Sequence, residues 1–181
     1  MATTVWRLDS ADGQLLVTTG VAGPAAKMGH RLTLSLTWEA TVQWVDDAPS
    51  EVEFVADVGS LQVLRGDGGV KGLTSPEKAL ARSNALKVFD AGRYPQIRFH
   101  AADITRAGDG YRLTGTLEIH GTTRPHVVDL QVEDLGDTSR MSCEGQVRHS
   151  DFGLKPYSLM MGAMKVTDEV TVSFSAERAT G

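Results

Sequence analysis

The chain has 181 residues, which fits a single domain over residues 1–181, and its 41% hydrophobic and 23% charged residues are typical of a globular protein rather than a disordered one. The formal net charge is −5 and no basic stripe occurs, so we expect no nucleic-acid binding and no electrostatic attraction to anionic membranes. No apolar stretch approaches the roughly 20 residues of a membrane-spanning helix, so we also expect no stable membrane insertion.

Cysteine usage and the N-terminal residues bear on the compartment. Cys143 is the only cysteine, so no intrachain disulfide can form, and a reducing compartment is permitted. The first residues show no basic start followed by an apolar run of signal-peptide length. We expect a cytoplasmic protein, or a periplasmic or secreted one if a leader has been removed.

Alternating hydrophobicity predicts a chain of β-strands. The first strands are expected around Val5 and over residues 15–18, and the clearest one covers residues 32–44. In that window every even position is apolar and every odd position is polar, which predicts a strand with one covered face and one wet face. Typical strands are about half as long, so this one indicates a curved sheet or a barrel.

The same alternation recurs further along the chain, and it predicts strands at residues 52–58, 97–100, 111–119, 128–132, 141–147 and 170–174. Amphipathic strands that follow one another can close edge to edge, which removes unpaired edges. The residues alone leave two architectures open, a closed antiparallel barrel and a two-sheet sandwich.

One segment breaks the alternation and predicts a helix at about residues 76–90. Thr74 or Ser75 can cap this helix, and Pro76 is tolerated in its first turn. The glycine-rich run at 64–76 before it is expected to be a mobile loop, because its spacing fits neither a dinucleotide-binding nor a Walker pattern. The apolar side chains that we expect on the inward face of the helix are Leu80, Leu86 and Phe89.

The sequence "LEIHGTTRP" at 117–125 predicts the turn of a hairpin. Gly121 can adopt a backbone conformation that other residues resist. Pro125 lacks a donor, so we place it at the beginning of a strand or in the loop. Arg124 is expected to point to solvent or to a carboxylate in a neighbouring loop.

No catalytic or metal-binding motif stands out. None of the five histidines pairs with another at the i, i+2 or i, i+4 spacing of ligands on one element. No G-x-S-x-G motif occurs, and Cys143 lies at an apolar position of its strand, where a cysteine acts as a small hydrophobe. We therefore predict no catalytic residue, no metal and no cofactor.

Four motifs in a fixed order resemble the YceI-like family, over nearly the whole chain. Each motif is weak alone, but their order is specific. They are "YPQIRF" after the helix, "LTGTLEIHGTTRP" in a hairpin, "SDFGLKPYS", and "DEVTVSF" in the last strand. The matching residues are Tyr94, Pro95, Ile97 and Phe99; Gly115, Leu117, Gly121, Thr123 and Pro125; Asp151, Phe152 and Gly153; Asp168, Glu169 and Val170; and Gly29 with His30.

The resemblance implies an all-β fold, an extended antiparallel β-barrel similar to a lipocalin, with a long apolar channel. It implies a bacterial lipid-binding protein that takes an isoprenoid, polyprenyl quinone or fatty-acid-like molecule and serves in transport or sensing. Barrels of this kind often associate, so a homodimer is compatible with it. The partner is then a hydrophobic small molecule.

Our first hypothesis is therefore a non-enzymatic carrier or sensor, because Ala40, Ala56, Gly115 and Gly145 at apolar positions leave interior space. The alternatives are an enzyme that acts on a lipid-like substrate in the same cavity, with His30 as its best polar candidate, and an interaction domain with a filled core. A methionine cluster at 160–164 suits either core filling or an adaptable binding surface. The predicted ligand-binding residues are Leu34, Leu36, Trp38, Phe54, Phe99, Leu117, Ile119, Met161, Met164 and His30.

Overall fold

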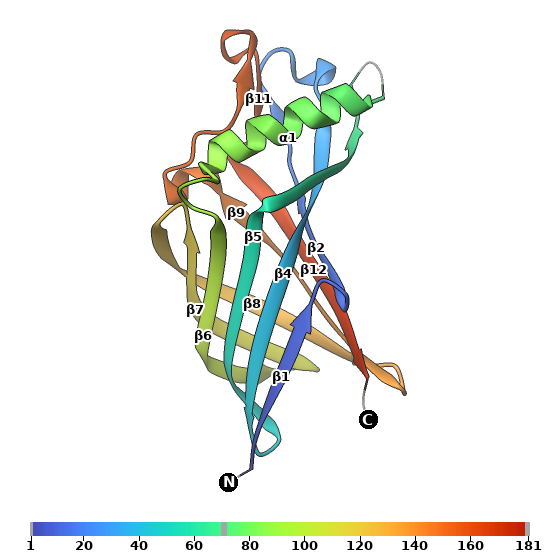
Figure 1. Ribbon diagram of the computed structural model, residues 1–181, viewed down its shortest axis with the longest axis vertical. Helices are drawn as coiled ribbons and strands as arrows, with labels where there is room; N and C mark the ends of the chain where they lie inside the picture. Colours follow the sequence, from blue (N-terminus) through green and yellow to red (C-terminus); the bar gives the residue numbers. More distant parts are fainter. Residues whose placement is uncertain (1, 70–71, 180–181) are drawn as a thin grey trace.

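The computed structural model describes residues 2–69 and 72–179, and its strands close into an antiparallel β-barrel (Figure 1). Eight strands form the wall in the order β4-β2-β12-β9-β8-β7-β6-β5, and pairing between β4 and β5 completes the ring. This closure confirms the barrel and excludes the sandwich. β1 extends the wall along the part of β4 that β2 does not cover.

The bounds of the elements follow the predicted alternation. The main strands are β1 (Thr3–Asp9), β2 (Gly13–Thr18), β4 (Arg31–Val45), β5 (Ala48–Asp67), β6 (Gln96–Ala107), β7 (Gly110–Ile119), β8 (Thr122–Asp134), β9 (Thr138–Arg148) and β12 (Glu169–Ala179). A small sheet contains β3 (Val21–Ala22), β10 (Ser158–Leu159) and β11 (Met164–Val166). Short 3₁₀ turns are η1 (Ala26–Met28), η2 (His149–Phe152) and η3 (Met160–Gly162).

The predicted helix is confirmed as α1 (Ser75–Phe89), which lies across one end of the barrel, while β1 begins at the opposite end (Figure 1). Thr74 and Glu77 form a capping box: the Thr74 hydroxyl accepts from the Glu77 N–H at 3.3 Å, and the Glu77 carboxylate accepts from the Thr74 N–H at 3.2 Å. Asp90, in the left-handed conformation, ends the helix. Within the described ranges, no helix is both long and apolar enough to cross a membrane.

The inward face of α1 differs from the prediction at one residue. Leu86 and Phe89 pack against the barrel core as expected, but Leu80 is 61% exposed. The reason is that the N-terminal half of α1 covers the mouth of a cavity rather than a packed core. An apolar side chain there borders open space instead of other side chains.

The predicted loop at 64–76 is shorter than expected. Residues 64–67 belong to β5, which pairs with β4 as far as Asp67 and Arg31. The last part of β5 can form a strand despite its glycines because β4 supplies a partner along its full length. Val70 and Lys71, which fall within the predicted loop, lie outside the described residues.

The hairpin between β7 and β8 has a two-residue turn, His120 and Gly121, both with positive φ. Pro125 lies inside β8 opposite Thr116, so its placement in the loop or at the beginning of the strand was wrong. The Thr116–Pro125 pair is a non-hydrogen-bonded one, so the Pro125 nitrogen lies on the side away from β7. The strand tolerates the proline because β9, on that side, pairs with β8 only from Gln131 onward. Arg124 contacts the Asp151 carboxylate at 3.7 Å, as one of its two predicted orientations requires.

Arg82 joins α1 to the wall. Its Nε donates to the Leu61 carbonyl at 2.7 Å and its Nη2 to the Gly59 carbonyl at 2.8 Å, at the place where β5 bulges away from β4. Arg82→Met removes both charge-assisted donors, so we expect the free energy of unfolding to fall by about 1.5–3 kcal/mol. Urea denaturation followed by circular dichroism measures this loss.

Lys87→Met is the matched control, because it removes a cation from an exposed helical position and should change stability by less than about 0.5 kcal/mol. Equal effects of the two substitutions would mean that the Arg82 bonds do not hold the helix on the barrel.

Candidate ligand-binding cavity

The barrel encloses a cavity of about 840 Å³, within the size range of small-molecule sites. Its wall is built from the covered face of each strand, so the alternation that predicted the strands also determines the lining. The contribution of the longest strand runs through consecutive even positions, namely Leu32, Leu34, Leu36, Trp38, Ala40 and Val42. Packed clusters lie around the cavity, one of them around Trp38 and the other around Phe99.

Nine of the ten predicted residues line this cavity. They are Leu34, Leu36, Trp38, Phe54, Phe99, Leu117, Ile119, Met164 and His30. Their contact with a ligand stays a prediction. The prediction that Met161 lines the channel was wrong, because its side chain is fully exposed and its backbone has φ 57° in the turn η3. That left-handed turn directs it away from the interior, while Met164, three residues later, lines the cavity.

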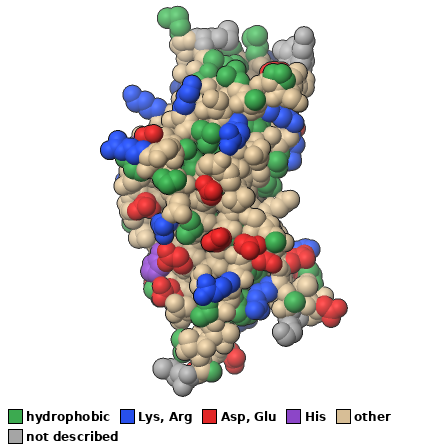
Figure 2. Space-filling model, viewed as in Figure 1, with side chains coloured by type: hydrophobic (Ala, Val, Ile, Leu, Met, Phe, Trp, Pro, Cys, Tyr) green, Lys and Arg blue, Asp and Glu red, His purple; other side chains and the backbone are tan. Residues whose placement is uncertain are grey.

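The mouth of the cavity lies beneath α1 and has an apolar rim. Met28, Leu80 and Leu159 line it and are all substantially exposed. Hydrophobic side chains are visible around this end of the molecule in Figure 2. The His30 imidazole also borders the mouth, and it lies so close to Gly69 that a Cβ there would stand 2.9 Å from Nε2. The rim of the mouth is therefore largely apolar.

Aromatic side chains occupy the opposite end of the barrel. The rings of Trp6 and Trp44 are 4.4 Å apart, and Tyr111 meets Trp44 edge to face at 6.5 Å. The Arg178 guanidinium lies 4.0 Å from the centre of the Trp6 ring. None of these four residues lines the cavity, so the cavity ends before this cluster.

Apart from His30, the sequence did not identify the polar side chains that line the cavity. Glu77 and Asn84 border it from α1, at the spacing that places residues on one helical face. His126 borders it from β8, with its ring edge-on to Phe99 at 5.9 Å. His126 could have been found from its even position, because Val128 and Leu130 at even positions were predicted on the covered face. It was missed because Pro125 argued against a strand that begins so early.

Two titratable groups in the wall are held in their uncharged forms. Burial lowers the pKa of the His126 imidazole and raises the pKa of the Cys143 thiol to about 11. Both side chains are therefore uncharged at neutral pH.

Alkylation of Cys143 by a bimane reagent tests that environment. Only the thiolate reacts, so we expect the rate to rise about tenfold per pH unit from pH 8 to 10. Glutathione under the same conditions should level off as its own thiol, with a pKa near 8.5, becomes fully ionised. A protein rate that levels off near pH 8.5 would show that water solvates this thiol freely.

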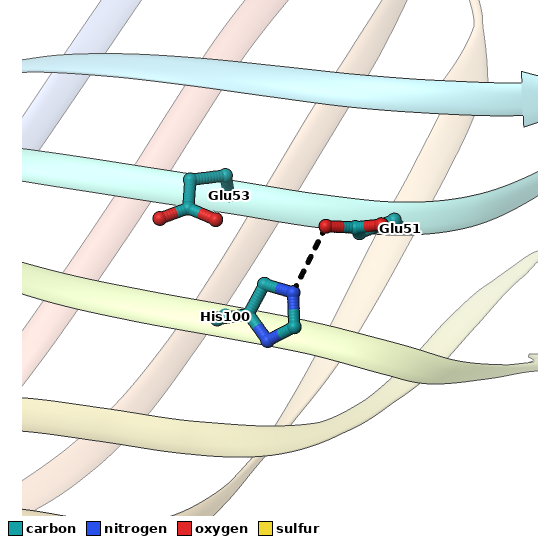
Figure 3. A group of neighbouring side chains, drawn as sticks. All are labelled: Glu51, Glu53 and His100. Carbon is teal, nitrogen blue, oxygen red and sulfur yellow. Dashed lines mark hydrogen bonds and ion pairs between the residues drawn. The ribbon is translucent and has the colours of Figure 1, made fainter.

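A separate polar group lies on the outer surface, where Glu51 and Glu53 of β5 face His100 of β6 (Figure 3). The three possible ligand atoms lie within 4.8 Å of one another, and His100 Nε2 is 3.0 Å from the Glu51 carboxylate. Arg98 already approaches Glu53 at 3.9 Å, and all these side chains are nearly half exposed. The arrangement is an exposed ion-pair network away from the cavity.

Three comparisons relate the chain to known proteins. The family model of the YceI-like domain matches residues 6–178. The fold is similar to that of Burkholderia cenocepacia BcnA, with a TM-score of 0.68 and 19% identity over 92% of this chain and 96% of that one. It is also similar to the Campylobacter jejuni YceI protein, with a TM-score of 0.58 and 16% identity over 80% of this chain and 81% of that one.

A curated UPF0312 protein of Pectobacterium atrosepticum is 25% identical over 76 residues, which is 39% of this chain. The match spans 40% of that relative's length. The structural likenesses show the fold alone at such low identity, whereas the family model covers nearly the whole chain. On that match, the chain belongs to the YceI-like domain family.

Proposed function

We propose that this protein binds and carries a long-chain apolar molecule of the isoprenoid, polyprenyl quinone or fatty-acid type inside its barrel. The observation that carries the proposal is the cavity of about 840 Å³ lined by the apolar face of the strands. A filled core would leave only voids near the size of a water molecule. Membership of the YceI-like family is consistent with a hydrophobic ligand.

The form of the cavity favours a tail over a compact ligand. It borders all eight strands of the barrel wall as well as α1, and its mouth has an apolar rim. Each methylene group buried from water contributes about 0.8 kcal/mol, so affinity should rise steadily with chain length. The neutral His126 and Cys143 add no charge that an apolar chain would have to tolerate.

Titration of delipidated protein with a polyprenyl quinone tests the proposal. Trp38 lines the cavity, so a bound quinone should quench its fluorescence with a stoichiometry of one. The same quinone ring without its tail should bind at least about a hundredfold more weakly, because the tail supplies most of the buried area. Native mass spectrometry of protein purified from its host should also show a bound mass that solvent extraction removes.

Two results would contradict the carrier. One is the absence of quenching and of any extractable mass. The other is equal affinity for the ring with and without its tail, which would place binding outside the long cavity.

A further inference from the structure

The barrel wall is incomplete between β8 and β9. These strands pair only over Gln131–Asp134 and Ser139–Ser142. Their other neighbours continue much further, since β7 pairs with β8 back to Thr122 and β12 pairs with β9 up to Arg148. Two strand edges therefore face each other without a ladder over more than half of their length.

The lining of the cavity shows that it passes through this gap. The other strands of the barrel wall contribute only alternate residues, as expected from side chains that point in turn inward and outward. β8 and β9 instead contribute the consecutive runs 126–130 and 143–148. Val127 and Glu144 are exposed on the outer face and still border the cavity, so the cavity reaches the surface here.

Several residues oppose closure of the ladder. Continuing the observed register would place Asp129 opposite Glu144, and like charges directly opposite each other destabilise a strand pair. It would also place Pro125, which has no donor, opposite Arg148. Gly145 adds no side chain to fill the gap, and a Cβ built there would meet nothing within 4 Å. The opening is therefore specified by the sequence.

The opening has defined ends, which makes it a slot. At one end is the last β8–β9 pair, Gln131 with Ser142. At the other end η2 packs beside β8, with Phe152 buried against the Phe99 cluster and Asp151 contacting Arg124. Between these limits lie residues 126–130 of β8 and 143–147 of β9, which we call the β8–β9 slot.

Backbone groups give the slot its polarity. Leu135 donates to the Thr138 carbonyl at the hairpin, which sets the alternation of hydrogen-bonded pairs along both strands. By that alternation the N–H and C=O groups of Val127 and Asp129, and of Glu144 and Gln146, face the slot. A ligand that both donates and accepts can satisfy such edges, whereas one that only donates or only accepts leaves half of them unpaired.

We propose that the β8–β9 slot is a head-group subsite for an uncharged polar group, such as a hydroxyl or amide, whose tail lies in the cavity. This inference rests on the proposed carrier function and narrows the ligand class to a long-chain alcohol or amide, because a quinone head only accepts hydrogen bonds and a fatty-acid head is anionic. The Glu144 carboxylate beside the slot disfavours an anionic head, whereas the Asp129 carboxylate is already paired with Arg112 at 2.8 Å. A cationic head offers no acceptor to the backbone N–H groups.

Three probes with the same tail test the subsite: dodecanol, dodecyl phosphate and dodecyltrimethylammonium, each below its micellar concentration. Displacement of the tail-binding dye N-phenylnaphthylamine gives their dissociation constants. We expect dodecanol to bind about tenfold more tightly than either charged probe. Glu144→Gln should bring the dissociation constant of dodecyl phosphate about threefold closer to that of dodecanol, because it removes a repulsive charge without placing a cation opposite Asp129.

Glu39→Gln is the matched control, since Glu39 is an exposed, outward-facing residue of β4 and does not line the cavity. It should leave the ratio of the two constants unchanged. Three results would overturn the slot and leave the carrier intact. The dye binds but all three probes displace it with equal affinity, a charged probe binds more tightly than dodecanol, or the two substitutions have equal effects. Failure of the dye and of every probe to bind would overturn the carrier itself, and the slot with it.

Discussion

Trp38→Ala is expected to lower the free energy of unfolding by about 3–5 kcal/mol. The side chain is 2% exposed, stacks on Phe54 at 5.5 Å and meets Phe174 edge to face at 4.8 Å. Its Nε1 also donates to the Gly13 carbonyl at 3.2 Å, which ties β4 to the beginning of β2. Removal of the indole leaves the Phe54 ring, the Phe174 ring and the Gly13 carbonyl without their partner.

Equilibrium denaturation in guanidinium chloride measures this loss. Trp38→Phe is the control, because it keeps a ring against Phe54 but loses the donor, and we expect it to cost about 1–2 kcal/mol. A loss below about 1 kcal/mol for the alanine variant would mean that the ring borders empty space on most sides. The distinction matters because Trp38 belongs both to the packed cluster and to the cavity lining.

The alternation of residues predicted the strands because it records which face is covered. It could not decide between barrel and sandwich, since both cover the same residues. That choice depends on which edges meet, here β4 with β5, and only the resemblance to a family supplied it. The helix was predictable for a different reason: Thr74, Pro76 and Glu77 are local signals that act within one turn.

The cavity lining was predictable for the same reason as the core, because residues such as Leu34 and Leu117 lie on covered faces whether the interior is full or hollow. The prediction for Met161 was wrong because a left-handed turn sets the direction of its side chain, and composition does not reveal such a turn. The β8–β9 slot could not be found from single strands. The opposition of Asp129 and Glu144 exists only once the register of the two strands is known.

Substitutions at two inward-facing glycines distinguish a hollow interior from a filled one. A Cβ at Gly115 would stand 1.9 Å from the His100 carbonyl oxygen, whereas one at Gly145 would meet nothing within 4 Å. Gly115→Ala forces a shift of the backbone of β6, so we expect it to cost about 3 kcal/mol or more.

Gly145→Leu should leave the free energy of unfolding within about 1 kcal/mol of the original value, because the new side chain enters open space and removes a flexible glycine from a strand. Its isobutyl group then occupies volume that a ligand tail would use, so we expect affinity for dodecanol and for a polyprenyl quinone to fall at least about tenfold, as the loss of a few buried methylene contacts requires. Thermal unfolding and dye displacement on the same preparation measure both quantities. If the protein is a carrier, Gly145→Leu keeps its stability and loses its affinity for the ligand. If Gly145→Leu is instead as destabilising as Gly115→Ala, the space beside β9 is packed, and the interior is a core with no room for a tail.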